Sequence, residues 1–315
     1  MILLVTNKRD ITTDYIVKEL RNRQLNYFRL NTESLANYDC SIGYDSVDDW
    51  RIGSVDGSQV QAAYFRRPLP PEYTRSKETS ENDYIKSEWL AFLKSVYARL
   101  DDKWFNSPIA IALAEDKPKQ LLIARKAGFK VPAGVITNLV DDIIHKTTNS
   151  QLIIKPVRQG LVEGEEERVI FTSRIPEITM DYKSAVSQVP SIFQQEVPKR
   201  YDVRVTVVGS RFFAVAILSQ VADQTEVDWR KGGRIDLHHE AIDLPQNIID
   251  SCIELMSKLN LRFGAIDLVC DLNGDYWFLE INPNGQWAWI ENQTKLPIAS
   301  AIVDELVSHG KKNEL

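Results

Sequence analysis

The sequence contains few of the residues that mark several protein classes. Cysteine occurs three times, at Cys40, Cys252 and Cys270, without a Cys-x-x-Cys spacing. This pattern excludes a disulfide scaffold and favours a reducing compartment, which we expect to be the cytoplasm. No apolar run approaches the ~18 residues of a membrane-spanning helix, so we expect no membrane partner. The four histidines show no metal-ligand spacing.

The sequence also lacks an excess of positive charge and a Gly-x-x-x-x-Gly-Lys-Ser/Thr phosphate loop. Its 38 Lys and Arg residues against 44 Asp and Glu residues give a net charge of −6, so we expect no nucleic-acid partner. Without that loop, any nucleotide site must be built in another way. The remaining composition, 43% hydrophobic and 26% charged among 315 residues, is typical of a globular protein with more than one core.

Strand and helix patterns alternate along the chain and predict an α/β (α+β) protein. A strand at 2–6, an amphipathic helix at 14–23 and a strand at 27–30 form a β-α-β start. Further patterns predict helices at 84–100, 117–128, 245–259 and about 297–307, and strands at 134–137, 151–156, 169–172, 192–197, 203–208 and 212–218. We expect three parts, residues 1–115, 116–198 and 199–315.

Two apolar segments near the end of the chain, 263–269 and 276–285, flank an Asn-Gly pair, which predicts a β-hairpin. Because side chains alternate along a strand, Glu280 and Asn282 share one face, and Asp267 of the other strand can lie near it. The opposite face carries Trp277, Leu279 and Ile281. Two carboxylates and an amide oxygen suit Mg²⁺. A plain polar outer face is the alternative, and it fits poorly because the polar residues interrupt a buried-looking run.

A polar loop follows the strand that ends at Lys155, and it contains Gly160 and Gly164. Such a strand–loop–strand can fold over phosphates. The four glutamates at 163 and 165–167 would repel phosphate, so we expect them to face solvent or a basic partner. The alternative interpretation of Lys155 is a solvated strand end.

Residues 194–199 leave a strand and expose backbone groups that can pair with the edge of adenine. Asp202 and Arg204 come next and share a strand face. They are either an ion pair of little value or a site in which Arg204 holds phosphoryl oxygens.

Two further segments carry arginines. Arg66 and Arg67 directly follow a strand and are either solvated charges or contacts to an anionic substrate. The loop containing Trp229 and Arg230 is also basic. We expect it to border the cleft between domains at which Arg66 and Arg67 would hold that substrate. Trp287 and Trp289 are either core residues or a platform for substrate.

The order of these features resembles the ATP-grasp ligases. More narrowly, residues 64–68, 228–230 and 278–287 resemble the ATP-grasp peptide maturases of the microviridin/graspetide class. The resemblance extends over nearly the whole chain. It implies a three-part ATP-grasp fold, in which an N-terminal open α/β domain precedes a central and a C-terminal sub-domain that hold ATP between them.

The resemblance also implies roles for individual residues. It assigns phosphate contacts to Lys117 and Lys155. It assigns adenine contacts to Gln195, Glu196 and Val197, and a ribose contact to Asp202. Two Mg²⁺ ions are assigned to Asp267, Glu280 and Asn282. Catalytic roles at the transferred phosphate fall to Arg204 and Arg230, and substrate contacts to Arg66, Arg67 and Trp229.

The implied substrate is a ribosomal precursor peptide with a leader and a core, and the implied assembly is a homodimer. Asp or Glu side chains of the core would become acyl phosphates, which Thr/Ser hydroxyls or a Lys amine attack to form ω-ester or ω-amide macrocycles. One alternative is a ligase acting on a small molecule or a protein tail, like the glutathione synthetases or ribosomal-protein glutamyl ligases. Another is a non-catalytic nucleotide-binding scaffold, which would not need a complete metal-ligand set.

Overall fold

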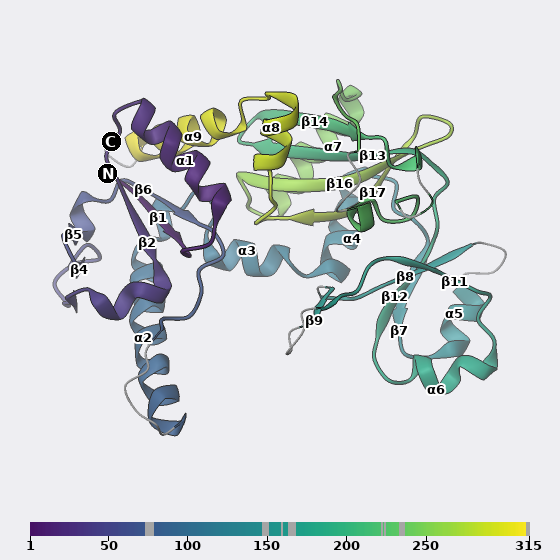
Figure 1. The fold of residues 1–315 in the computed structure, drawn as a ribbon, viewed down its shortest axis with the longest axis horizontal. Helices are drawn as coiled ribbons and strands as arrows, with labels where there is room; N and C mark the ends of the chain where they lie inside the picture. Colours follow the sequence, from purple (N-terminus) through teal and green to yellow (C-terminus); the bar gives the residue numbers. More distant parts are fainter. Residues whose placement is uncertain are drawn as a thin grey trace. The chain divides into compact units, whose positions relative to one another are not determined.

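The computed structural model describes residues 1–72, 79–146, 151–158, 160–162, 168–221, 223, 225–232 and 237–312. The chain divides into two compact units (Figure 1). Unit 1 contains residues 1–111, 260–263 and 284–315, and unit 2 contains residues 112–259 and 264–283. Unit 1 is therefore assembled from both ends of the sequence. The division into three consecutive parts, 1–115, 116–198 and 199–315, stays a prediction. The two units are defined by contacts between residues and not by consecutive segments, so they do not test it.

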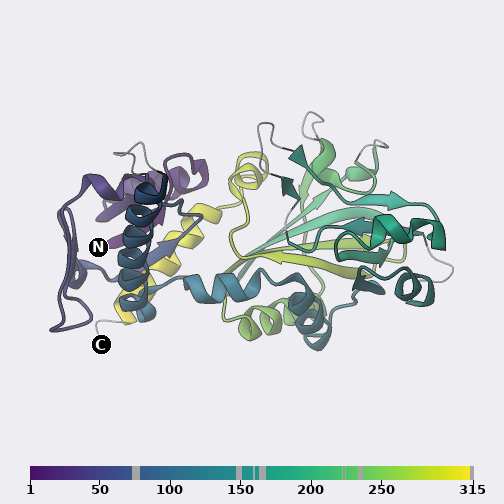
Figure 2. The ribbon, with the colours of Figure 1, turned by 90° about the horizontal axis from the view of Figure 1, so that it is seen from below.

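Unit 1 contains a parallel sheet in the order β2-β1-β6. Ile2 of β1 (Ile2–Thr6) lies opposite both Tyr27 of β2 (Tyr27–Asn31) and Ala62 of β6 (Ala62–Phe65). Helix α1 (Ile11–Asn22) connects β1 to β2, and α9 (Ile298–Lys312), yellow in Figure 2, packs against α1, β1 and β6. All five residues of β1 are buried, as expected for a strand covered on both faces.

A second, antiparallel sheet of unit 1 contains β3 (Cys40–Ile42), β4 (Trp50–Ile52) and β5 (Val55–Asp56). Helix α2 (Thr79–Arg99) places Leu93 and Val96 in a core with Leu3 and Leu30 of the parallel sheet. Helix α8 (Ala288–Thr294) precedes α9, and α3 (Pro108–Ala114) leads out of unit 1.

Unit 2 contains two larger sheets and a short two-stranded one. The first has the order β11-β8-β12-β7, with β7 (Gly134–Thr137), β8 (Leu152–Lys155), β11 (Ser173–Ile175) and β12 (Ser191–Gln195) all antiparallel to their neighbours. Helices α5 (Val140–Lys146) and α6 (Lys183–Val186) contribute Ile143 and Val186 to its core. Strands β9 (Leu161–Val162) and β10 (Arg168–Val169) form the short pair.

The second sheet of unit 2 has the order β15-β14-β13-β16-β17. Its strands are β13 (Lys199–Val208), β14 (Arg211–Ile217), β15 (His239–Ala241), β16 (Phe263–Asp271) and β17 (Tyr276–Asn282). Helix α4 (Lys117–Lys126) packs against β17 and against α7 (Gln246–Lys258). Helix α4 ends two residues before Gly128, whose φ of +96° is a left-handed conformation that favours glycine.

Short 3₁₀ segments complete the architecture at Thr32–Asn37, Gly57–Gln59, Asp101–Lys103, Met180–Tyr182, Ser219–Val221 and Trp229–Gly232. Among the described residues, no helix combines the length and the apolar character that crossing a membrane requires.

Most of the predicted elements are confirmed, including the hairpin of β16 and β17. The predicted strand at 169–172 is wrong, because β10 ends at Val169 and β11 begins at Ser173. The backbone N–H of Thr172, between them, donates to a carboxylate of another segment, Asp228, at 3.1 Å. Helices α3, α5 and α8 were not predicted. Each has seven residues, which is too short for a clear helical periodicity.

Candidate active site

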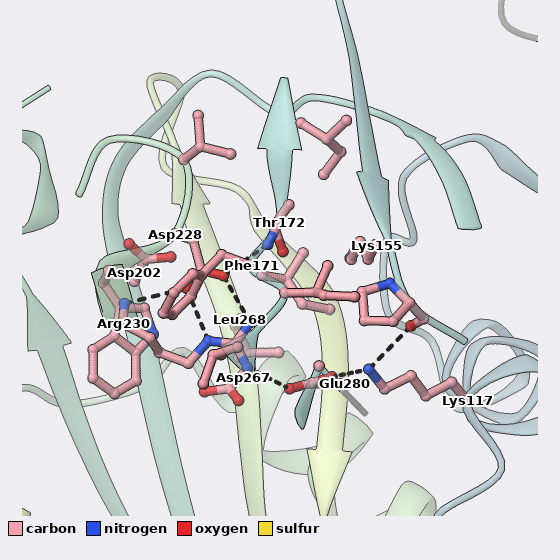
Figure 3. Close-up of a pocket in the computed structure, with 18 residues that line it drawn as sticks. Lys117, Lys155, Phe171, Thr172, Asp202, Asp228, Arg230, Asp267, Leu268 and Glu280 are labelled. Carbon is pink, nitrogen blue, oxygen red and sulfur yellow. Dashed lines mark hydrogen bonds and ion pairs between the residues drawn. The ribbon is translucent and has the colours of Figure 1, made fainter. Parts of the chain in front are cut away.

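A pocket of about 310 Å³ lies between the two larger sheets of unit 2 (Figure 3). The first sheet contributes Ile153 and Lys155 of β8, and the second contributes residues of β16 and β17. The start of α4, Pro156, Gly160 and the segments 169–172 and 227–230 complete the walls. Seven of the residues that we predicted from the sequence line it: Lys117, Lys155, Asp202, Trp229, Arg230, Asp267 and Glu280.

A β-bulge determines which side chains of β17 reach this pocket. Asp267 lies opposite Glu280, but Leu268 lies opposite Phe278, so Leu279 is an extra residue in the strand. The prediction that Leu279 points away from Glu280 is therefore wrong, since both residues line the pocket. The bulge places an apolar and an acidic side chain next to each other at the same site.

The two facing carboxylates of Asp267 and Glu280 are held by cations. Arg204 Nε lies 2.7 Å from Asp267 Oδ1, and Lys117 Nζ lies 3.2 Å from Glu280 Oε2. Arg230 Nη1 is 3.8 Å from the other oxygen of Glu280. Like charges directly opposite each other on neighbouring strands repel, so these cations stabilise the pair.

Asp228 is a site residue to which the sequence analysis gave no role. Its carboxylate is 4% exposed and accepts two bonds of 2.8 Å from Arg230, through Nε and Nη2, in addition to the bond from Thr172 N–H. It therefore fixes the direction of the Arg230 guanidinium and ties down the chain between β10 and β11. In sequence it looks like an ordinary acidic loop residue, because its partner Thr172 is 56 positions away.

Burial changes the proton affinities of the pocket. It raises the pKa of Asp267 to about 6, against the opposing charge of Arg204. Burial also acts to raise the pKa of Glu280, but the charges of Lys117, Arg230 and Lys155 outweigh it and hold that pKa below its ordinary value. For Lys155, burial lowers the pKa to about 8, and the charge of Glu280 limits the decrease. Perturbed groups of this kind are typical of functional sites.

Asp202, the predicted ribose contact, is already engaged within the protein. Lys199 Nζ bonds both of its oxygens, at 2.8 and 2.7 Å, and the Ser219 hydroxyl donates to one of them. The side chain is 6% exposed. This geometry favours a role for Asp202 in orienting Lys199, which lines the adjoining slot.

The adjoining slot is small and mainly apolar. It shares Ile153, Val227 and Leu279 with the main pocket and is bordered by residues 194–197. Gln195, Glu196 and Val197, the predicted adenine contacts, therefore lie together beside it. Glu196 N–H donates to Gln151 O at 2.8 Å, so this N–H is already occupied within the protein.

An unexpected polar atom also lies at this slot. Gln194 is 2% exposed, and its Oε1 has no hydrogen-bond partner among the described residues. A buried acceptor without a donor is costly, and the amino group of adenine would supply one. The slot has a volume of about 40 Å³, so a ring the size of adenine would enter only if its walls moved apart.

The predicted metal ligands are partly brought together. Asp267 and Glu280 face each other at the pocket, whereas Asn282 lies opposite Ala265 and is not among the described lining residues. The described part of the chain contains no cluster of three or more His, Cys, Asp and Glu side chains suited to a metal ion. The Asp267–Glu280 pair nevertheless offers hard oxygen ligands, which fit Mg²⁺ that keeps water and phosphate as its other ligands.

The predicted substrate contacts Arg66 and Arg67 belong to unit 1. Arg66 is 1% exposed, and its guanidinium contacts Asp10 Oδ2 at 3.0 Å and the carbonyl oxygens of Asn284 and Gly285, both at 3.0 Å. This placement favours a structural role for Arg66, whereas Arg67 lines a separate pocket of unit 1. Trp287 is a fully buried core residue.

Comparisons with known proteins give relatives of one fold. A scan against protein-family models finds no match. A RiPP-associated ATP-grasp ligase of Chryseobacterium gregarium, solved with ADP and a leader and core peptide, matches 98% of this chain and 96% of its own with a TM-score of 0.86 and 24% identity. Macrocyclase MdnC of Microcystis aeruginosa MRC, bound to precursor peptide MdnA, matches 98% of this chain and 99% of its own with a TM-score of 0.82 and 25% identity.

A curated relative is described as a probable alpha-L-glutamate ligase of Rhodopirellula baltica. It is 26% identical over 249 residues, which are 75% of this chain and 59% of that protein. The chain thus spans well under two thirds of this relative. The fold expected from the sequence is confirmed over nearly the whole length: the chain has the fold of the solved ATP-grasp ligases, and it is similar to a RiPP-associated ligase and to a macrocyclase.

Proposed function

We propose that this chain is an ATP-dependent ligase that activates Asp or Glu side chains of a precursor peptide and joins them to hydroxyl or amine groups of the same peptide. The observation that carries the proposal is the pocket of unit 2, in which cations surround the facing carboxylates of Asp267 and Glu280. A small apolar slot with an unsatisfied acceptor shares three of its lining residues. Phosphates with Mg²⁺ suit the pocket, and a base at the slot would place them there.

The charge balance of the pocket supports a requirement for magnesium. The four carboxylates Asp202, Asp228, Asp267 and Glu280 face five cations, Lys117, Lys155, Lys199, Arg204 and Arg230, which leaves an excess of one positive charge. A nucleoside triphosphate adds roughly four negative charges, which divalent ions must neutralise. We propose two Mg²⁺ ions at Asp267 and Glu280, with Asn282 as a further ligand once the side chains rearrange.

The residues of the pocket then have distinct tasks in the reaction. Lys117 and Lys155 hold phosphate oxygens, while Asp228 aims Arg230 at the phosphoryl group being transferred. Arg204, which pairs with Asp267 in this structure, would steady the same group, and Asp267 would then be available to a metal ion. A substrate carboxylate oxygen attacks the γ-phosphorus, ADP leaves, and an acyl phosphate forms. A hydroxyl or amine then attacks the acyl carbon and phosphate leaves, so one ester or amide bond forms for each ATP consumed.

The peptide substrate is proposed from the solved relatives, two of which hold a leader and core peptide or a precursor peptide. The test is incubation of the full chain with ATP, Mg²⁺ and a short peptide rich in Asp/Glu and Thr/Ser or Lys, taken from a neighbouring reading frame. Mass spectrometry should show loss of one water for each bond, dependent on both ATP and Mg²⁺. No ATP-dependent mass change with any such peptide would contradict the proposal.

The curated relative favours a second candidate, glutamate ligation. The same experiment with free glutamate added distinguishes the two, because ligation adds glutamyl mass to an acceptor, whereas cyclisation only removes water. We also propose a microviridin/graspetide-type product, a homodimeric assembly and a reducing, cytoplasmic location consistent with the three free cysteines. Light scattering of the purified chain tests the dimer.

A further inference from the structure

A buried glutamine of α4 contacts the edge of β17, the strand that carries Glu280. Gln120 is 3% exposed, and the proposed reaction does not use it. Its Nε2 donates to Ile281 O at 2.8 Å, and its Oε1 accepts from Ile281 N at 3.0 Å. Because β17 is the last strand in the sheet order, the carboxamide bonds both backbone groups of Ile281 as a neighbouring strand would.

Three hydrogen bonds determine the orientation of this carboxamide. Besides the two bonds to Ile281, Nε2 donates to Ala114 O, at the end of α3, at 2.5 Å. Both contacts of the nitrogen are carbonyl oxygens and the contact of the oxygen is an N–H group, so a rotated carboxamide would place like groups together. Helix α4 therefore cannot slide along β17 without leaving several buried polar groups unpaired, which is costly.

The side chain of Ile281 is held as firmly as its backbone. It is 2% exposed, and it fills the space over Gly264 of β16, where an added Cβ would lie 2.7 Å from Ile281 Cδ1. The pairing with β16 is regular here, with Glu280, Ile281 and Asn282 opposite successive residues. Since side chains alternate along a strand, Glu280 and Asn282 project from the face opposite to Ile281. Fixing Ile281 thus fixes the backbone that carries these two proposed Mg²⁺ ligands.

Gln120 lies one helical turn after Lys117, and residues three apart share a helix face. Lys117 Nζ lies 3.2 Å from Glu280 Oε2 (Figure 3), so α4 and β17 are joined by two adjacent contacts. The first is an ion pair whose partners a phosphate and a metal ion would take. The second is neutral and buried, and neither ligand competes for it. The contact of Gln120 with Ile281 can therefore keep α4 and β17 in register while Lys117 and Glu280 change partners.

We propose that Gln120 is a positioning residue that holds Glu280 in place for Mg²⁺ and so determines how strongly Mg²⁺ promotes nucleotide binding. The role in metal binding rests on the proposed function, whereas the restraint of Ile281 rests on the contacts alone. A carboxylate that is already in place loses less conformational freedom when a metal ion binds. Partners that orient metal ligands accordingly change metal affinity by about tenfold to 100-fold.

The test is Gln120→Met, which keeps the length of the side chain and removes its hydrogen bonds. Calorimetric titrations of the full chain with ADP, in the presence and absence of Mg²⁺, give the factor by which Mg²⁺ raises ADP affinity. This Mg²⁺ factor should decrease about tenfold in Gln120→Met. A general loosening of the pocket would instead weaken ADP binding equally under both conditions and leave the Mg²⁺ factor unchanged.

Leu255→Ala is the matched control for lost stability. Leu255 is fully buried in α7, so this truncation should lower Tm by several degrees, as the lost hydrogen bonds should in Gln120→Met. The Mg²⁺ factor should keep its wild-type value in Leu255→Ala. Hydrogen exchange of residues 278–283 without ligand should be faster in Gln120→Met than in Leu255→Ala. If Gln120→Met does not fold, Gln120→Asn, whose amide is one methylene shorter, should lower the Mg²⁺ factor at least threefold, roughly the loss of one hydrogen bond.

A wild-type Mg²⁺ factor in the folded Gln120 variants would overturn the proposal. Equal hydrogen exchange of residues 278–283 in Gln120→Met and Leu255→Ala would overturn it too, because Gln120 would then not restrain Ile281. Failure of the proposed ligation is distinguishable, since the Mg²⁺ factor would still decrease in Gln120→Met while no peptide loses water with ATP. Absence of ADP binding by the wild-type chain would overturn the proposed function and the metal role of Gln120 together.

Discussion

Each carboxylate of the nucleotide pocket has a cation beside it in the protein, and this matching determines how the pocket accepts charged ligands. Arg204 neutralises Asp267, and Lys117 neutralises Glu280. A phosphate group competes for the same cations, and a metal ion competes for the same carboxylates. When phosphate and metal bind together, the cations pair with the phosphate and the carboxylates pair with the metal, so no buried charge is left unpaired. When either binds alone, a buried charge of the protein loses its partner.

We therefore expect Asp267→Asn and Glu280→Gln to separate nucleotide binding from catalysis. Each should lower ATP-dependent water loss about 100-fold, the usual scale for removing a preorganised electrostatic group. Metal-free ADP should bind as tightly as before or more tightly, because Arg204 or Lys117 is released. Titration of ADP with and without Mg²⁺ measures this. Glu240→Gln, on the exposed part of β15, is the control. A loss of metal-free ADP affinity in Asp267→Asn or Glu280→Gln would contradict the exchange.

Lys155 makes nucleotide affinity depend on pH. Its pKa of about 8 lies below the ordinary 10.5 because the side chain is buried. The charged form therefore destabilises the folded protein below pH 8, and this cost fades as the pH rises toward 10.5. Phosphate needs the charged form, so ADP affinity should decrease above pH 8, by up to about tenfold per pH unit.

Calorimetric titrations of ADP between pH 7 and 9.5 test this dependence. In Lys155→Met the pH-dependent decrease should disappear, while in Lys130→Met, which removes a half-exposed lysine paired with Asp275, it should persist. A wild-type affinity that is constant across this range would refute a phosphate contact by Lys155.

The acidic hairpin residues and Lys155 could be predicted because each lies in a recognisable local pattern. Asp228 and the inward position of Leu279 could not. The first depends on a hydrogen bond to Thr172, and the second on the register between β16 and β17. Register is decided by how a whole strand packs, so one bulged residue overrides the alternation that the sequence suggests.

At the scale of elements, Arg174 of β11 joins two segments that border the apolar slot. It pairs with Glu196, beyond the end of β12, through bonds of 2.7 and 2.8 Å, and with Glu226 through bonds of 2.9 and 2.8 Å. Exposed ion pairs contribute little to the free energy of unfolding. The two bidentate contacts of Arg174, which join two segments that border the slot, can still slow the opening of the slot.

Arg174→Ala should therefore speed ADP release about threefold to tenfold, with a change in Tm of less than about 3 °C. Stopped-flow dissociation of a fluorescent ADP analogue provides the rate. Lys258→Ala removes an ion pair on the exposed side of α7 and should leave the rate unchanged. Similar release rates in both variants would mean that the Arg174 contacts do not restrain the slot.

At the scale of the whole molecule, the described residues that line the pocket proposed for the nucleotide all belong to unit 2. The strand and helix pattern predicts the parallel sheet of unit 1 well. It does not predict that α9 completes this sheet, because the contacts of α9 with α1 and β6 join residues more than 200 positions apart.

ADP with Mg²⁺ should accordingly protect unit 2 and not unit 1. Ligand at 100 times its Kd stabilises the binding state by about 2.7 kcal/mol. Hydrogen exchange followed by mass spectrometry should show slower exchange in β8, β16 and β17, and unchanged exchange in β1 and β2. Protection confined to β1 and β2 would contradict the assignment of the nucleotide to unit 2.

The assembly of unit 1 from residues 1–111 and 284–315 affects how the protein is made. On the ribosome the segment synthesised first emerges without α8 and α9, so the surfaces of α1, β1 and β6 that α9 contacts are not yet covered. Unit 2 can fold while that segment waits, and unit 1 closes only after residues 298–312 have left the exit tunnel. A premature stop codon near position 284 would thus damage the earliest-made part of the polypeptide, and chaperones or proteases would meet that exposed surface first.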